Sequence, residues 1–340
     1  ILNQLEDLDD VIDAPNLEGV TIRDTLHEGV LEPGTFGDRL VAINYVLTVY
    51  GLWYSASLFD EHGWEVPTTL DEALELGAAA QDEGLYLFVW GQEAATYYQT
   101  MAIDAAIKEA GDEVRLPLEH LEEGAWSHEA VQEAFNKLKE IVDAGYFMPG
   151  GSGTQFTAAQ AQWSLEQEAI LYPSGAWIEN EMADQTAEGF EMRGFPTPSV
   201  SSNALMPATA IHSTAGEPFV VPSDAANMAG GKELLRIMLS EESATNFARE
   251  NLAQTIVADT VPEDGFGSTA LVSQIEMLDA AGTDVFTWDF VSRYGMNQDM
   301  LVSWNSFLDG QTSVEELTED LQGITDAVRE DDAIEIIEVT

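Results

Sequence analysis

The stretch LYPSGAWIENEM, residues 171–182, carries a tryptophan, two glutamates and an asparagine directly after a Pro-Ser-Gly turn. A glycosidase would need two carboxylates flanking one bond. Glu179 and Glu181 are two residues apart, so a helix would direct them to different faces. With 62 acidic residues in the chain, some close pair of acids is expected by chance. We therefore interpret these acids as poor candidates for catalysis.

Aromatic residues beside glycines, amides and single acids form a second pattern. Sugar rings present apolar faces and a rim of hydroxyls, so a carbohydrate site combines flat aromatic rings with polar side chains. Most such rings belong to cores, but α/β folds bind ligands at strand ends, which favours Trp177 after its glycine as a sugar platform. The other aromatic and amide candidates are Trp53 and Tyr54 in YGLWY, Trp90, Tyr97, Tyr98 and Gln99 in FVWGQEAATYYQT, and Trp163 in QAQW.

Motifs for other chemistry are missing from the sequence. It contains no GxSxG, HExxH, GxxxxGK[ST] or GxGxxG motif. The 5 histidines have no ligand spacing, which favours surface or helix-start positions, and the absence of cysteine excludes disulfides and thiolate metal sites. EDGFGS, from Glu263, is interpreted as a turn. We expect no catalytic residues, no metal and no cofactor.

The charge balance excludes further classes of function. The 62 acidic residues face 12 basic ones, giving a formal charge of -50. Nucleic-acid binding needs clustered Lys and Arg, and an anionic membrane would repel this chain. The acids are spread along the sequence, which indicates a solvated surface and a soluble monomer. No apolar run approaches the ~20 residues of a membrane span, and a first residue other than Met suggests N-terminal trimming.

Helical and strand patterns alternate along the chain. Ser127 is the expected N-cap of a helix that stops at Gly145, and capping boxes start helices at Thr69 with Glu72 and at Ser313 with Glu316. Residues 230–252 predict two helices broken near Ser240. Buried strands are expected in the apolar run from residue 40, at 85–90, in the run ending at 175 and in the run ending at 223. This alternation predicts an α/β fold.

Several of these stretches, in this order, resemble the extracellular solute-binding proteins of carbohydrate ABC importers. They are YGLWYSASLFDEHGWEVPTTLDEALELG, QFTAAQAQWSLEQEAILYPSGAWIENEM and AGEPFVVPSDAANMAGGKELLRIMLSEESATNFA. The stretches KEAGDEVRL and TVPEDGFGSTALVSQ resemble the members that bind N-acetylglucosamine and N,N'-diacetylchitobiose. The resemblance runs from about residue 40 to near the C-terminus.

The resemblance implies a two-lobed, type II periplasmic-binding-protein-like fold whose lobes close over a sugar held in a cleft. It implies that the N-terminal part of the first lobe is missing, that 1–45 is the remainder of that lobe with a hinge crossing, and that 46–215 is the second lobe. Residues 216–285 would return to the first lobe, and 286–340 would be C-terminal helices across both. The resemblance further implies ligand contacts from Trp177 and its neighbours Glu179 and Asn180, from Trp53, Tyr54 and Glu217, and from Trp288 and Tyr294 near the C-terminus.

The function implied by the resemblance is binding of N-acetylglucosamine or a chitooligosaccharide such as diacetylchitobiose in a cleft between the lobes. The sugar would be delivered to the membrane permease subunits of an ABC importer, outside the cell and with a lipid anchor on the protein. One alternative is the same fold with another oligosaccharide, such as a maltodextrin. The alternative from another class is a secreted glycoside hydrolase acting on chitin-like chains. Competition binding separates a protein that binds amino sugars from one that binds another oligosaccharide. Product release from a chromogenic chitobioside would indicate the hydrolase.

Overall fold

The computed structural model describes residues 2–339, and the chain divides into two compact units. Unit 1 comprises Ile1–Val49, Gly175–Asn180 and Ser213–Ile275, and unit 2 comprises Tyr50–Ser174, Glu181–His212 and Glu276–Thr340. The chain passes from one unit to the other within β3, α8, β7 and α11 and at the end of β5. Each unit combines helices with strands, which confirms the predicted α/β class.

Unit 1 is built around the pairing of β3 with β7. These strands are antiparallel, with Ile43 opposite Phe219 and Val49 opposite Ser213. The unit contains α1 (Asp9–Ile12), the hairpin β1 (Thr35–Phe36) and β2 (Arg39–Leu40), the first part of β3 (Ile43–Ser55), most of β7 (Ile211–Phe219), α9 (Met228–Met238) and α10 (Glu241–Asn251). It also takes most of α8 (Ile178–Glu181) and the first half of α11 (Thr269–Ala281).

Unit 2 holds the larger set of helices around a small sheet. Its strands are the end of β3, with β4 (Tyr86–Phe88), β5 (Ala169–Gly175), β6 (Met192–Phe195) and β8 (Val285–Phe286). β4 and β5 are parallel, β5 neighbours β3, and β6 pairs with β3 in the antiparallel sense. Its helices are α2 (Ala56–His62), α3 (Leu70–Asp82), α4 (Thr96–Ala110), α5 (Asp112–Glu119), α6 (Glu129–Asp143), α7 (Phe156–Ser164), α12 (Phe290–Arg293), α13 (Asn297–Leu308) and α14 (Val314–Arg329).

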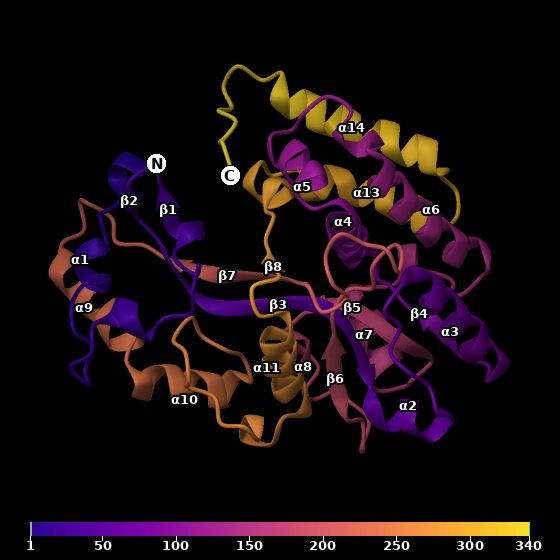
Figure 1. Ribbon diagram of the computed structural model, residues 1–340, viewed down its shortest axis with the longest axis horizontal. Coiled ribbons are helices and arrows are strands. Elements are labelled where there is room, and N and C mark those ends of the chain that lie inside the picture. Colours follow the sequence, from indigo (N-terminus) through magenta and orange to yellow (C-terminus); the bar gives the residue numbers. More distant parts are fainter. Residues whose placement is uncertain (1, 340) are drawn as a thin grey trace. The chain divides into compact units, whose positions relative to one another are not determined.

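Helix α4 lies at the centre of unit 2. Helices α6 and α13 pack against it, and α14 packs on α13 (Figure 1). Residues are buried along nearly every side of α4, as is usual for a helix inside a core rather than on its surface. This central position means that side chains on α4 are fixed by surrounding packing, which matters for the site described below.

The helix starts follow the capping chemistry of the sequence. Both predicted capping boxes are formed, at Thr69 with Glu72 and at Ser313 with Glu316. The expected break between two helices is also present, because the Ser240 side chain accepts a hydrogen bond from the Ser243 backbone N–H and starts α10. Local polar side chains therefore suffice to place these boundaries.

Two expectations about element ends are wrong. The N-cap of α6 is His128 rather than Ser127: His128 has extended backbone angles and its Nδ1 accepts from the Ala130 N–H at 3.2 Å. Ser127 lies instead in a preceding 3-10 turn. The strand expected to end at residue 223 begins and ends earlier, as β7, because its pairing partner β3 begins at Ile43 and supplies no backbone groups beyond that point.

Candidate functional site

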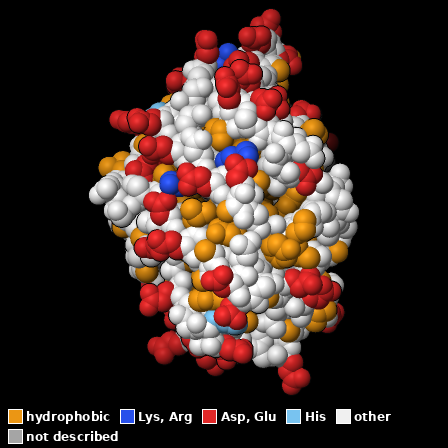
Figure 2. All heavy atoms as spheres, turned by 90° about the vertical axis from the view of Figure 1, so that its right-hand side faces the viewer, with side chains coloured by type: hydrophobic (Ala, Val, Ile, Leu, Met, Phe, Trp, Pro, Cys, Tyr) orange, Lys and Arg blue, Asp and Glu red, His pale blue; other side chains and the backbone are white. Residues whose placement is uncertain are grey.

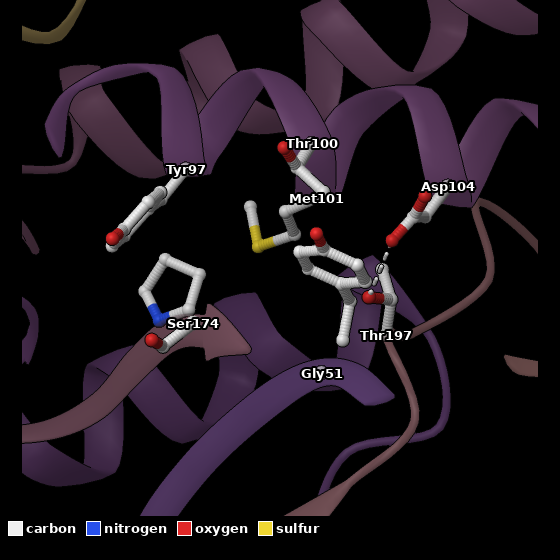
Figure 3. Close-up of a pocket in the computed structure, with 9 residues that line it drawn as sticks. Gly51, Tyr97, Thr100, Met101, Asp104, Ser174 and Thr197 are labelled. Atoms are coloured by element: carbon white, nitrogen blue, oxygen red, sulfur yellow. Dashed lines mark hydrogen bonds between the residues drawn. The ribbon is translucent and has the colours of Figure 1, made fainter. Parts of the chain in front are cut away.

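A small pocket in unit 2 lies against one face of α4. Helix α4 contributes Tyr97, Thr100, Met101 and Asp104, which follow one another at helical spacing along that face (Figure 3). Facing them are residues from β3, the end of β5 and the segment after β6. These are Tyr50, Gly51, Pro173, Ser174 and Thr197. Aromatic rings, an apolar thioether and hydroxyls thus meet in one hollow.

Asp104 is a fixed acceptor at this pocket. It is 1% exposed, and its Oδ1 accepts a 2.8 Å hydrogen bond from Trp288 Nε1. Oδ2 accepts from Thr197 Oγ1 at 3.4 Å (Figure 3), and His212 Nδ1 lies 3.0 Å from Oδ1, at an ion-pair distance without hydrogen-bond alignment. A carboxylate held by so many neighbours is positioned and rigid, which suits recognition rather than proton transfer.

His212 contradicts the expectation that the histidines occupy surface or helix-start positions. It lies in β7, is 4% exposed, and stacks on Tyr50 with ring centroids 4.4 Å apart. Trp288 stacks on it as well, at 5.2 Å. The imidazole is therefore part of an aromatic stack that supports the wall of the pocket.

Lys108 lies one helical turn beyond Asp104 and is fully buried. Its ammonium donates to the backbone carbonyl oxygens of Thr197, at 2.6 Å, and Ala208, at 2.8 Å. Burial lowers the pKa of Lys108 to about 8, while the charge of Asp104 acts in the opposite direction. Lys108 anchors the segment that carries Thr197 to α4.

The stability of unit 2 is expected to rise as the pH passes from 8 towards 10.5, relative to a Lys108→Met variant. The folded-state pKa lies below the ordinary value of 10.5, so the unfolded state binds more protons in that window and deprotonation favours the folded state. Between pH 7 and 9.5 the wild type should gain about 2 kcal/mol over the variant. Urea unfolding of both proteins at the two pH values measures the difference. Tyrosine ionisation affects both proteins equally. A difference in their free energies of unfolding that is the same at the two pH values would therefore contradict the lowered pKa of Lys108.

The turn at the end of β5 presents Trp177 in unit 1. Trp177 is half-buried, and its ring covers Gly175 so closely that a Cβ at that glycine would lie 1.9 Å from Trp177 Cζ3. Glu179 accepts a hydrogen bond from Ser268 Oγ at 2.5 Å, and burial raises the pKa of Glu179 while that hydrogen bond opposes the rise. Glu181 instead accepts from Gln160 within unit 2. The two glutamates have separate partners and do not form an acid pair, as predicted.

Four of the predicted aromatic contacts are buried side chains of unit 2. Trp53 is fully buried and donates through Nε1 to the Ser174 carbonyl at 3.1 Å, and Trp90 is 1% exposed. Tyr98 donates to the Val89 carbonyl at 2.7 Å, and Trp163 is fully buried and stacks on a neighbouring tyrosine. Their burial favours a packing role, and direct contact with a ligand stays a prediction for each of them.

The remaining predicted residues lie in varied surroundings. Gln99 is 2% exposed, and Trp288 is 9% exposed and committed to Asp104. Asn180 is exposed in unit 1, as is Glu217, whose φ of 56° places it in the left-handed region. Tyr294 is half-buried in unit 2. Its hydroxyl accepts from the backbone N–H of Ile337 at 2.9 Å.

Tyr54 lines a second, more open hollow in unit 2. It packs on Phe59 with ring centroids 4.6 Å apart, and Trp64 and Asp60 lie on the same hollow. The walls are formed by α2 and the loop that follows it. The hollow is thus separate from the pocket at α4.

The structure brings together residues that were not selected from the sequence. Thr100, Met101 and Asp104 share one face of α4 with the candidate Tyr97, whereas Tyr98 faces the core. The sequence signal that could have found them is their helical spacing. Consecutive positions on a helix point about 100° apart, so residues three or four apart lie on the same face. Ser174 was likewise overlooked, although it precedes the glycine that ends a fully buried strand.

The surface carries the acidic charge predicted by the composition. Figure 2 shows Asp and Glu side chains spread over one face with few Lys or Arg among them. Among residues 2–339, no cluster of three or more His, Asp or Glu side chains is arranged to hold a metal ion. None of the described helices is both long and apolar enough to cross a bilayer.

The fold and this arrangement of rings and polar groups are those of a binding protein, and comparison with known families agrees. Residues 3–245 match the family described as bacterial extracellular solute-binding protein. The chain belongs to this family, which confirms the resemblance identified from the ordered motifs. Because members of the family are solute-binding proteins, the prediction of a non-enzymatic function is also confirmed.

Individual proteins of known function or structure are also similar to this chain. The chain is 56% identical over 340 residues to the diacetylchitobiose-binding protein NgcE of Streptomyces coelicolor, covering 100% of this chain and 72% of that protein. A chitin oligosaccharide-binding protein of known structure gives a TM-score of 0.76 at 18% identity, over 96% of this chain and 80% of that one. The solute receptor AcbH, described as preferring β-D-galactopyranose, also gives 0.76 at 17% identity, with the same coverage of 96% and 80%. Such distant structural likenesses establish the shared binding-protein fold.

Proposed function

We propose that this protein binds N,N'-diacetylchitobiose or related N-acetylglucosamine oligosaccharides and delivers them to the permease subunits of an ABC importer. The observation that carries the proposal is the 56% identity over the whole chain to a diacetylchitobiose-binding protein. Neighbours of the same fold bind other sugars, such as raffinose, so the fold by itself does not select the solute.

The pocket against α4 supports the proposal by its chemistry. Tyr97 supplies an aromatic ring, Ser174 and Thr100 supply hydroxyls, and Met101 supplies apolar surface. This mixture matches a sugar, which has apolar ring faces and a polar rim. We propose that this pocket, which is lined by residues of unit 2, contacts the sugar. In unit 1 we propose that Trp177 stacks on a sugar ring, with Glu179, Asn180 and Glu217 as polar neighbours.

The proposal also covers where the protein acts, its oligomeric state and its division into lobes. We propose that the protein acts outside the cell as a monomer, held at the membrane by a lipid anchor, and that its many surface acids keep it soluble. The division into a first lobe at 1–45 and 216–285 and a second lobe at 46–215, with 286–340 spanning both, is part of the same proposal. Closure of two lobes around the ligand would then create the form that the permease recognises.

Isothermal titration calorimetry tests the solute. N,N'-diacetylchitobiose is expected to bind at least tenfold more tightly than maltose, because relatives at this identity commonly keep the groups that contact the ligand. N-acetylglucosamine serves as the shorter ligand. Tight binding of maltose with no heat from either amino sugar, in protein whose circular dichroism shows it to be folded, would replace the proposal with the maltodextrin alternative. Release of product from a chromogenic chitobioside would favour the hydrolase.

A further inference from the structure

The pocket against α4 is small and its lining is of mixed chemistry. It has room for about a single water-sized group beyond its lining atoms. Met101, from α4, is 2% exposed (Figure 3). Pro173, from β5, adds apolar surface to the lining. Such a space receives a methyl-sized group and excludes anything much larger.

Ser174 gives the same pocket a polar group without a partner. The residue is 5% exposed, and within residues 2–339 no hydrogen-bond partner is found for its Oγ. Buried hydroxyls are nearly always hydrogen-bonded, so an unpartnered one in the wall of a pocket indicates a position where a ligand atom completes the bond. The backbone of Ser174 is fixed independently, because its carbonyl accepts from Trp53 Nε1.

We infer that this pocket receives the 2-acetamido group of the sugar and selects N-acetylated sugars over those with a hydroxyl at that position. The inference rests on the proposed function and identifies the acetamido group as the part of the sugar that this pocket recognises. An acetamido group presents one methyl and one carbonyl oxygen, which match the apolar surface at Met101 and Pro173 and the hydroxyl of Ser174. A hydroxyl at that position is shorter than an acetamido group and has no methyl to contact the apolar surface. One methyl in an apolar pocket changes selectivity about 10- to 200-fold.

Paired ligands test the selectivity directly. Diacetylchitobiose and cellobiose share the same linkage and differ at the acetamido positions, so calorimetry on the wild type should give at least a tenfold preference for diacetylchitobiose. A matched dipropionyl disaccharide, with one more methylene on each amide, should bind at least tenfold more weakly than the diacetyl sugar because the small pocket has no room for the added group. Equal binding of cellobiose and diacetylchitobiose would overturn the inference and leave the proposed binding of diacetylchitobiose intact. Failure of every sugar in folded protein would overturn the proposed function, and the inference with it.

Two variants locate the selectivity in the pocket. Met101→Ala enlarges the pocket and should bring the affinity for the dipropionyl sugar to within about threefold of that for the diacetyl sugar. Ser174→Ala should lower the affinity for diacetylchitobiose about 2- to 10-fold, the effect of one hydrogen bond, and leave cellobiose unchanged. Ser164→Ala is the matched control, since that serine is buried in unit 2 with its Oγ bonded to the Gln160 and Gln185 carbonyls.

Thermal unfolding of each variant separates loss of fold from loss of selectivity. Should Met101→Ala prove unfolded, Ser174→Ala and the propionyl series on the wild type still decide the question. Unchanged discrimination in both variants, with melting temperatures close to that of the wild type, would show that the acetamido group lies elsewhere.

Discussion

Trp177→Ala is expected to lower the affinity for N,N'-diacetylchitobiose by at least about 30-fold, the effect of truncating a tryptophan that dominates a binding surface. The ring is half-buried and lies close to Gly175, while the side chain keeps exposed area. Calorimetry with the purified variant measures the loss. The affinity of Trp177→Phe, which keeps a smaller ring, should lie between those of Trp177→Ala and the wild type.

Gly175→Ala provides a second route to the same effect without removing the ring. A Cβ at residue 175 would lie 1.9 Å from Trp177 Cζ3, so the indole must move from its position. The two substitutions should therefore be non-additive: in the Trp177→Ala background, Gly175→Ala should cost little further affinity. Additive losses would mean that Gly175 acts through the strand rather than through Trp177.

Trp64→Ala is the matched control for loss of an aromatic ring. Trp64 is also half-buried, and it lies at the separate hollow beside Tyr54 in unit 2. Its removal should leave the affinity for the disaccharide within about twofold, provided that the protein remains folded. If the affinity survives Trp177→Ala as well, then Trp177 is a packing residue and the stacking role assigned to it is wrong.

Asp104→Ala is expected to destabilise unit 2 by about 3–5 kcal/mol, the range for breaking a buried charged network by removing one partner. The substitution leaves Trp288 Nε1 without its acceptor and removes the carboxylate that favours the charged form of Lys108. Urea unfolding followed by circular dichroism measures the free energy. Asp104→Asn keeps an oxygen acceptor and loses the charge, so its effect should be smaller.

Glu75→Ala on α3 is the control for removing an acid from this highly acidic protein. Glu75 is exposed, and surface substitutions of this kind usually change stability by less than about 0.5 kcal/mol. A loss below about 1 kcal/mol for Asp104→Ala would show that the network around Asp104 contributes little to the fold. In that case the position of the pocket would depend mainly on the apolar packing of α4.

Sequence patterns were sufficient for several elements because their determinants are local. A serine or threonine that bonds the N–H three residues on starts a helix wherever it occurs, so the boxes at Thr69 and Ser313 formed as predicted. The N-cap of α6 was assigned to Ser127 and belongs to His128, since both neighbours carry a suitable acceptor and only backbone angles separate them. The order of long motifs gave the family, which the comparison confirms.

Which aromatic side chains line a pocket was decided by the tertiary structure. Tyr97 and Tyr98 are adjacent and chemically identical, but α4 turns by about 100° between them. The packing of unit 2 buries Tyr98, which bonds the Val89 carbonyl, and leaves Tyr97 at the pocket. Trp53 and Trp163 are fully buried for the same reason. Composition determines that a chain carries rings suited to sugars, whereas exposure depends on distant segments that cover one face of each element and leave the other open.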